Sequence, residues 1–478
     1  MKFIGRKDEL TRLEKFVDSK QPAIAAIYGR RRIGKSSLIK QALAGRDALF
    51  FDALEERPRR EQISHFMFQL LQQLEAADRS QIPTSAAAPA TWKQGFLLLF
   101  TALKAKPCVV VFDEFQWMAN YRHELIADLK FVWDGFFATL PGQKLILCGS
   151  IASFMVNKVI KSSAFYGRID TQMQLSGFKL KETSELLAGR GADEIMKAQM
   201  LTGGIPKYLR LLSGFTSIQL AMEDLAFTPN GYFTAEYERI FTSHFGKNPD
   251  FEKIVRTLAT RPLGLFREEL ARSAKLVTGG QLSTELRDLE SAGFISATTP
   301  FDKGENSRHI KYFLSDAYLR FYFSFIRPNL KKIRSGHSQT LFAAITQTGA
   351  WHVWMGRSFE YLCLQHADLI SRQLGFSGID FTVGPYFAPT KRGRVGVQVD
   401  LVFDRADGVL TVCEMKYSRR PVGTEVIADM ERKVQFLQRA ADRKTIQRIL
   451  IVHNEPSPAL VKSGYFYRII DASRLFSE

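Results

Sequence analysis

The 478-residue chain has few cysteines and no long apolar run. Its four cysteines, Cys108, Cys148, Cys363 and Cys413, lie far apart, which excludes the paired spacing of a zinc site or a disulfide framework. This usage predicts a reducing, cytoplasmic setting. No stretch approaches the roughly 18 consecutive apolar residues of a membrane span, and the first ten residues lack an apolar signal segment, so we expect no membrane partner.

The chain also has fewer acidic than basic side chains. The chain has 49 Asp and Glu against 66 Lys and Arg, a formal net charge of +17. A positive field attracts polyanions, so DNA is the expected macromolecular partner. At roughly 100–200 residues per domain, the length predicts about three domains.

The order of apolar runs and amphipathic stretches predicts four segments. Residues 1–175 alternate strand-like and helix-like runs, which indicates an α/β core with a mostly parallel sheet. Residues 176–245 read as a helical lid. Three short helices before a β-like stretch predict a winged helix-turn-helix over residues 248–325. Residues 345–478 predict a separate α/β domain.

A phosphate-binding motif lies near the start of the chain. Residues 29–36, GRRRIGKS, fit the pattern GxxxxGK[ST] between a strand-like run and a helix. Glycines and the helix N-terminus turn backbone N–H groups toward phosphate oxygens. We therefore expect Gly29, Gly34, Lys35, Ser36 and Ser37 to bind ATP, with Lys35 at the β- and γ-phosphates and Ser36 as a Mg²⁺ ligand.

Later strand-like runs end on polar residues that suit the same site. After residues 109–112, Asp113 is expected to support Mg²⁺ and Glu114 to act as the general base for the attacking water. Ser150 follows residues 144–149 and is either a γ-phosphate sensor or an ordinary turn residue. Arg168 either reaches the nucleotide of a neighbouring subunit in a homo-oligomer or forms a structural ion pair, and the second is favoured.

Six segments in order resemble the archaeal-type ATPase family, signal-transducing NTPases related to AAA+ proteins. They are FIGRKDELTRLEKF (3–16), GRRRIGKSSL, VVVFDEFQW, LILCGS, YGR (166–168) and GGIPKYL (203–209). The resemblance covers about residues 1–240 and implies a P-loop AAA+-like ATPase domain with a helical lid. It also implies that Gly204-Ile205-Pro206 is a turn through which the lid contacts the nucleotide; the alternative is a helix-breaking turn with no ligand contact.

The predicted third helix of the winged segment has apolar residues at helical spacing and polar residues facing outward. The outward side chains suit a DNA major groove, but acidic neighbours on the same helix oppose it, so contact with DNA and packing against protein stay equally open. Three basic wing residues are expected to meet phosphates. The outward residues are Gln281, Ser283, Thr284 and Arg287, the acidic ones Glu285, Asp288 and Glu290, and the wing residues Lys303, Arg308 and Lys311.

Residues 395–418, VGVQVDLVFDRADGVLTVCEMKYS, predict a β-hairpin turning near Asp407. Because side chains alternate along a strand, Glu414 and Lys416 share a face and Asp400 falls opposite Glu414. Facing carboxylates repel each other, so a divalent cation is the natural compensation. We expect Asp400 and Glu414 to bind a Mg²⁺ that activates water, with Lys416 positioning the nucleophile or neutralising developing charge.

The D…ExK spacing resembles the PD-(D/E)xK restriction-endonuclease-like superfamily, over roughly residues 345–420. That resemblance implies a nuclease fold in which Glu360, within GRSFEYLC, completes the metal site. The alternative is a salt-bridge patch on an inactive nuclease fold. Lys391, Arg392 and Arg394 either hold a DNA backbone or form a solvated loop.

Together these observations predict an ATP-hydrolysing P-loop ATPase, with ATP and Mg²⁺ as cofactors, coupled to DNA binding and Mg²⁺-dependent DNA cleavage. The alternative is an ATP-regulated switch or scaffold whose nuclease-like domain binds DNA or protein without cutting. A third possibility is an ATP sensor that does not hydrolyse its ligand.

Overall fold

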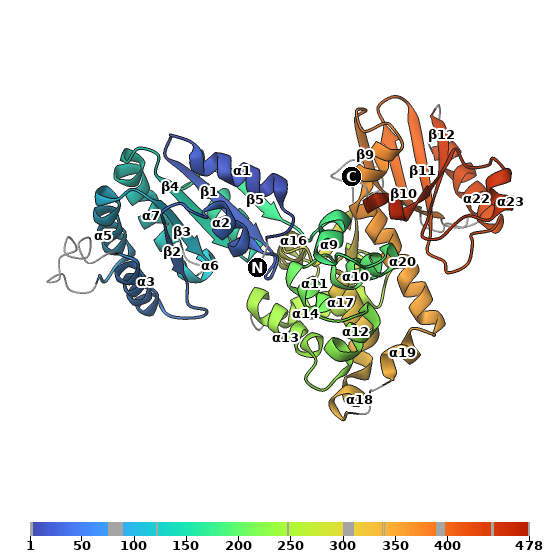
Figure 1. Ribbon diagram of the computed structural model, residues 1–478, viewed down its shortest axis with the longest axis horizontal. Coiled ribbons are helices and arrows are strands. Elements are labelled where there is room, and N and C mark those ends of the chain that lie inside the picture. Colours follow the sequence, from blue (N-terminus) through green and yellow to red (C-terminus); the bar gives the residue numbers. More distant parts are fainter. Residues whose placement is uncertain are drawn as a thin grey trace. The chain divides into compact units, whose positions relative to one another are not determined.

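The computed structural model describes residues 3–74, 89–120, 123–245, 248–299, 310–336, 338, 340–388, 397–440 and 444–476. The chain divides into two compact units, Met1–Gly177 and Phe178–Glu478. They are coloured blue to teal and green to red in Figure 1. Within the described ranges, no helix combines the length and apolar character needed to cross a membrane.

Unit 1, Met1–Gly177, is built on a five-stranded parallel sheet in the order β2-β3-β4-β1-β5, as the alternation of strands and helices predicts. Parallel strands bring their carboxyl ends to one edge, so the residues that follow β1, β3 and β4 meet there. The strands are β1 (Ala23–Gly29), β2 (Ala48–Asp52), β3 (Val109–Asp113), β4 (Lys144–Gly149) and β5 (Ile169–Leu175).

Helices of unit 1 flank the sheet (Figure 1). One face is buried by a cluster to which three helices contribute Phe66, Phe96 and Leu129, and in which the rings of Phe66 and Phe96 pack against Phe112 of β3. Thr91 and Gln94 cap the second of these helices reciprocally, which fixes its start. The helices are α1 (Lys7–Asp18), α2 (Lys35–Ala42), α3 (Arg59–Gln73), α5 (Trp92–Ala105), α6 (Phe115–Met118), α7 (Glu124–Gly135) and α8 (Ala152–Phe154).

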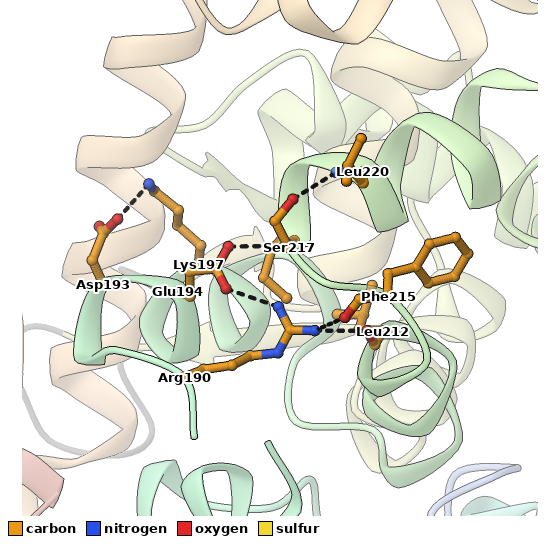
Figure 2. A network of polar contacts seen from close by, with 9 residues as sticks. Arg190, Asp193, Glu194, Lys197, Leu212, Phe215, Ser217 and Leu220 are labelled. Atoms are coloured by element: carbon orange, nitrogen blue, oxygen red, sulfur yellow. Dashed lines mark hydrogen bonds and ion pairs between the residues drawn. The ribbon is translucent and has the colours of Figure 1, made fainter. Parts of the chain in front are cut away.

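Unit 2, Phe178–Glu478, begins with the helices of the predicted lid. Arg190 links these helices, because its guanidinium donates hydrogen bonds to Glu194 at 2.8 Å and to the Leu212 carbonyl at 3.2 Å (Figure 2). Glu194 also accepts a hydrogen bond from the Ile218 amide. Asp193 pairs with Lys197 one turn along the same helix. The helices are α9 (Leu180–Leu186), α10 (Ala192–Thr202), α11 (Pro206–Ser213), α12 (Ile218–Phe227) and α13 (Tyr232–Phe245).

The segment predicted to be a winged helix has three helices and a small antiparallel sheet in the order β6-β8-β7. Leu282, Leu286 and Leu289 of its third helix are buried, as their spacing predicts. The elements are α14 (Pro249–Ala259), β6 (Leu265–Phe266), α15 (Arg267–Ala274), α16 (Gly280–Ser291), β7 (Ile295–Thr298) and β8 (Lys311–Leu314).

The surroundings of Lys311 differ from the predicted contact with DNA phosphates. Its ammonium lies over the Phe387 ring, 4.6 Å from the centroid, and over Phe266 at 5.2 Å, because β8 is packed against these aromatic residues rather than projecting into solvent. Burial lowers the pKa of its ammonium. Lys303 and Arg308 lie outside the described residues.

A connecting helical segment leads from β8 to the C-terminal sheet. It contains α17 (Ala317–Phe321), a wider helical turn at Tyr322–Ile326, α18 (Leu330–Arg334) and α19 (Leu341–Ile345). Its aromatic side chains pack on Trp351 and Trp354 at the start of the next helix, with Phe325 5.3 and 5.6 Å from the two rings.

The C-terminal sheet has the order β13-β12-β11-β10-β9. β9, β10 and β11 are antiparallel, and the predicted hairpin is formed by β10 and β11, whereas β11, β12 and β13 are parallel. Lys391, Arg392 and Arg394 lie outside the described residues. The elements are α20 (Gly349–Gln365), α21 (Ala367–Gln373), β9 (Phe381–Ala388), β10 (Val397–Arg405), β11 (Val409–Lys416), α22 (Glu425–Ala440), β12 (Thr445–Val452), α23 (Pro458–Lys462) and β13 (Arg468–Asp471).

Candidate functional site

The phosphate-binding loop connects β1 to α2 in unit 1. Gly29 has φ +152°, and a Cβ there would lie 2.4 Å from the Leu175 carbonyl oxygen of β5, so only glycine fits. Gly34 has φ +93° and immediately precedes α2, a conformation that L side chains rarely adopt. These two glycines place the unpaired N–H groups of the first turn of α2 at the carboxyl edge of the sheet.

Lys35 is buried beneath this loop. Its ammonium donates to the carbonyl oxygens of Gly29 at 3.0 Å and Arg30 at 3.3 Å, and the residue is 5% exposed. No carboxylate pairs with it among the described residues. A buried ammonium whose partners are all neutral carbonyls is well suited to donate instead to phosphate oxygens, because a hydrogen bond to a charged oxygen is stronger.

Ser36 and Asp113 meet across the edge of the sheet. The Ser36 hydroxyl donates to Asp113 Oδ2 at 2.5 Å. Mg²⁺ prefers oxygen ligands such as a hydroxyl and a carboxylate, so this pair fits a Mg²⁺ bound with the nucleotide. Ser37 is exposed on the same turn of α2.

Glu114 is fixed by a polar network that the sequence indicates only in part. Its backbone is in the left-handed region, φ 50°, where β3 ends. Its Oε2 accepts a hydrogen bond from the Ser150 hydroxyl at 2.6 Å and another from the Gln116 side-chain amide. Gln116 also donates to Ser150 Oγ at 3.0 Å and accepts from the Ser150 amide. These hydrogen bonds therefore fix the orientation of the Glu114 carboxylate, next in sequence to Asp113 of the Ser36–Asp113 pair.

Two further residues that the sequence singles out, Arg168 and Pro206, lie in surroundings that the structure describes within their own units. Arg168 donates to both carboxylate oxygens of Asp134, at 2.7 and 2.9 Å, which is the structural ion pair that the sequence favours. Pro206 is the first residue of α11, and Gly203 and Gly204 before it have positive φ. A Cβ on Gly204 would lie 2.2 Å from the Phe178 carbonyl oxygen, so the turn needs glycine for packing within unit 2.

A second polar cluster lies on the C-terminal sheet. The register that pairs Leu401 with Cys413 places Asp400 beside Glu414, and Asp400 sits where the β9–β10 register shifts between Val399 and Val402. Such a bulge re-aims a side chain. Lys416 Nζ lies 2.8 Å from Glu414 Oε1.

Lys433 of α22 is the member of this cluster that the sequence did not reveal. Its Nζ lies 2.5 Å from Glu414 Oε2 and 3.7 Å from Asp400 Oδ2. The Glu414 side chain is 3% exposed, and those of Lys433 and Asp400 are each 13% exposed. The ammonium therefore bridges two buried carboxylates.

Burial and mutual repulsion dominate the titration of these acids. Burial raises the pKa of Glu360 to about 8, and the neighbouring Asp400 adds to the rise. Burial likewise raises the pKa of Asp400 to about 6, while Lys433 opposes the shift. The pKa of Lys433 is raised because its carboxylate neighbours outweigh its own burial.

The cluster departs from the expected metal set of Glu360, Asp400 and Glu414. Among the residues that the structure describes, no three acidic, histidine or cysteine side chains are arranged to hold a metal ion together. The physical reason is Lys433, which supplies between Asp400 and Glu414 the positive charge that a metal would supply. A Mg²⁺ here would have Asp400 and Glu414 as its oxygen donors and would displace the ammonium.

Glu360→Gln is expected to remove a pH dependence from the stability of the chain. Glu360 has a raised pKa in the folded chain, so the folded chain holds this proton more tightly and stability falls as pH rises from about 4.5 to about 8. Glutamine does not ionise, so the variant loses this fall. Thermal unfolding in EDTA should show the variant more stable than wild type at pH 9 and closest to it at pH 5. A constant difference across that range would contradict the raised pKa.

Comparison with known proteins finds similarity to ATPases in the N-terminal part of the chain. Residues 3–212 match the model of an ATPase domain found predominantly in Archaea. Residues 3–212 are therefore similar to the ATPase domain of that family, and the protein is an ATPase. An uncharacterized protein of Methanocaldococcus jannaschii is 25% identical over 341 residues, 70% of this chain and 71% of that protein.

Two solved structures are similar over a comparable stretch. The Walker-type ATPase of Pyrococcus abyssi is 21% identical and covers 67% of this chain and 96% of its own, with a TM-score of 0.49. The ORC2 protein of Aeropyrum pernix, solved as ADPNP–ADP complexes, is 15% identical and covers 68% and 94%, with a TM-score of 0.42.

Proposed function

We propose that Lys35, Ser36, Asp113 and Glu114 carry out the ATP hydrolysis of this ATPase. The observation that supports it best is the placement of Glu114, held by Ser150 and Gln116 at the sheet edge that also carries the Ser36–Asp113 contact. Mg²⁺ held by Ser36 and supported by Asp113 would neutralise phosphate charge when bound. Lys35 exchanges its carbonyl partners for β- and γ-phosphate oxygens.

In this proposal Glu114 orients the attacking water and accepts its proton. Ser150 and Gln116 donate to one carboxylate oxygen, which leaves the other oxygen for the water. Ser150 is then placed to respond to the γ-phosphate through Glu114. Pro206 and the turn before it are proposed to contact the nucleotide from the lid and report its state.

We further propose that the C-terminal carboxylate cluster cleaves DNA. Asp400 and Glu414 supply two oxygen donors for Mg²⁺, and Lys416, whose side chain is 36% exposed, is the group best placed to reach a phosphodiester. The net charge of +17 favours a polyanionic substrate. Lys433 also supports the alternative, because a cluster whose charges balance without a metal is suited to a scaffold that binds DNA or protein without cutting.

The test is cleavage of plasmid and linear DNA with and without ATP and Mg²⁺. We expect wild type to cut with Mg²⁺, and Asp400→Ala and Lys416→Ala to lose cleavage while keeping ATP hydrolysis. Asp429→Ala, which removes an exposed carboxylate from α22, is the matched control and should cut normally. If wild type leaves every DNA form intact, the scaffold alternative replaces the nuclease.

A further inference from the structure

Unit 2 contains a cavity of about 430 Å³ that is separate from the carboxylate cluster. Its walls come from α14, the end of β8, the helical segment after β8, and α20. The volume lies in the range that small-molecule sites occupy. Two guanidinium groups, Arg320 and Arg357, line it, and none of its lining residues is acidic.

Arg320 is the clearest sign that the cavity is built for an anion. Its guanidinium stacks 4.0 Å from the Tyr361 ring centroid and donates through Nη1 to the Ser315 carbonyl at 3.0 Å. Within the described ranges no carboxylate pairs with it, and its Nε has no hydrogen-bond partner. Burial lowers the pKa of this guanidinium to about 10. A buried cation with an unused donor is costly unless an anion completes it.

A flat apolar wall adjoins this charge. Trp354 stacks on Trp351 with ring centroids 5.6 Å apart, and Phe325 meets Trp354 edge-on at 5.6 Å. Trp354 Nε1 also has no hydrogen-bond partner in the described part of the chain. Buried indole N–H groups usually have one, so the wall of this cavity carries a second donor without a partner.

We propose that this cavity binds a small organic anion: its acidic group sits on Arg320 and Arg357, and its flat apolar body lies against Trp354 and Phe325. Arg357 and Tyr361 also line the smaller cavity that contains Glu360 and Asp400. An occupant would therefore contact α20, the helix that carries Glu360. The binding itself does not depend on whether the carboxylate cluster cuts DNA.

The test uses two fluorescent probes that share an apolar body and differ in charge. One is 8-anilino-1-naphthalenesulfonate, and the other is N-phenyl-1-naphthylamine, which lacks the sulfonate. Titrations of the full chain are made with saturating Mg²⁺ and ADP so that the nucleotide site is filled. We expect saturable binding of the sulfonate probe and much weaker binding of the neutral one.

Substitutions of residues that line the cavity test whether the probe binds there. Arg320→Gln and Arg357→Gln should each lower the affinity for the sulfonate probe about tenfold or more, because a charged hydrogen bond is lost. The affinity for the neutral probe should stay unchanged. Ala350→Trp, at an exposed lining position, should block the cavity even if Arg320→Gln fails to fold. Arg432→Gln removes the same charge from the exposed surface of α22 as a control. Absent binding, equal affinity for both probes, or affinity that none of the cavity variants changes would overturn the proposal.

Discussion

Glu114→Gln is expected to slow ATP hydrolysis by about 10²–10⁴-fold, the usual contribution of a general base. Glutamine keeps the size of the side chain and an oxygen that accepts from Ser150, so the network around it should survive. It cannot take a proton from water, so ATP should stay bound and intact. Steady-state phosphate release measures the rate, and recovery of bound nucleotide after gel filtration shows whether it is still ATP.

The control for this variant is Glu124→Gln. Glu124 is an exposed carboxylate on α7 that pairs with Arg59 at the surface, so its loss should leave turnover unchanged. Undiminished hydrolysis by the Glu114 variant would show that another group activates the water. It would also remove the assigned role of Ser150 and Gln116, which act only through Glu114.

Lys433→Met is expected to destabilise the chain by about 3–5 kcal/mol at pH 8, because it leaves the buried Asp400 without an ion-pair partner and leaves the buried Glu414 with Lys416 alone. The loss should shrink at pH 5.5, below the raised pKa of Asp400 of about 6, where this carboxyl takes up a proton instead. Urea unfolding in EDTA, followed by tryptophan fluorescence, measures the change. If Asp400 and Glu414 bind Mg²⁺, added MgCl₂ should stabilise this variant more than wild type.

Arg432→Met is the matched control, because Arg432 precedes Lys433 on α22 and its side chain is 68% exposed. Its effect should stay within about 0.5 kcal/mol. Equal unfolding midpoints for the two variants would mean that the buried carboxylates do not need the Lys433 ammonium.

Local pattern was enough to predict much of this architecture. The glycine-rich loop and the strand ending at Asp113 are contiguous signals, and the parallel sheet follows from the alternation of strands and helices. The facing of Asp400 and Glu414 follows from two-residue periodicity and one turn position.

Residues brought in by tertiary packing could not be predicted. Lys433 lies on α22, and which face of this helix contacts the sheet is known only from the structure. In the sequence alone, Lys433 cannot be told from the many surface lysines. Gln116 lies two residues past Glu114, but its contact with Ser150 depends on the neighbouring strand β4. The pairing of Arg168 with Asp134 joins residues 34 positions apart. Each depends on contacts that no sequence period encodes.

The central claim is that the loop at residues 29–36 grips a nucleoside triphosphate through backbone amides and the Lys35 ammonium. Calorimetric titration of the full chain with ATP and Mg²⁺ tests it most directly. We predict one ATP bound per chain by wild type and an affinity lowered roughly 100-fold in Lys35→Ala, since charge-assisted contacts to phosphate are lost. Equal ATP affinity in the two proteins, or no uptake by folded wild type, would contradict the claim.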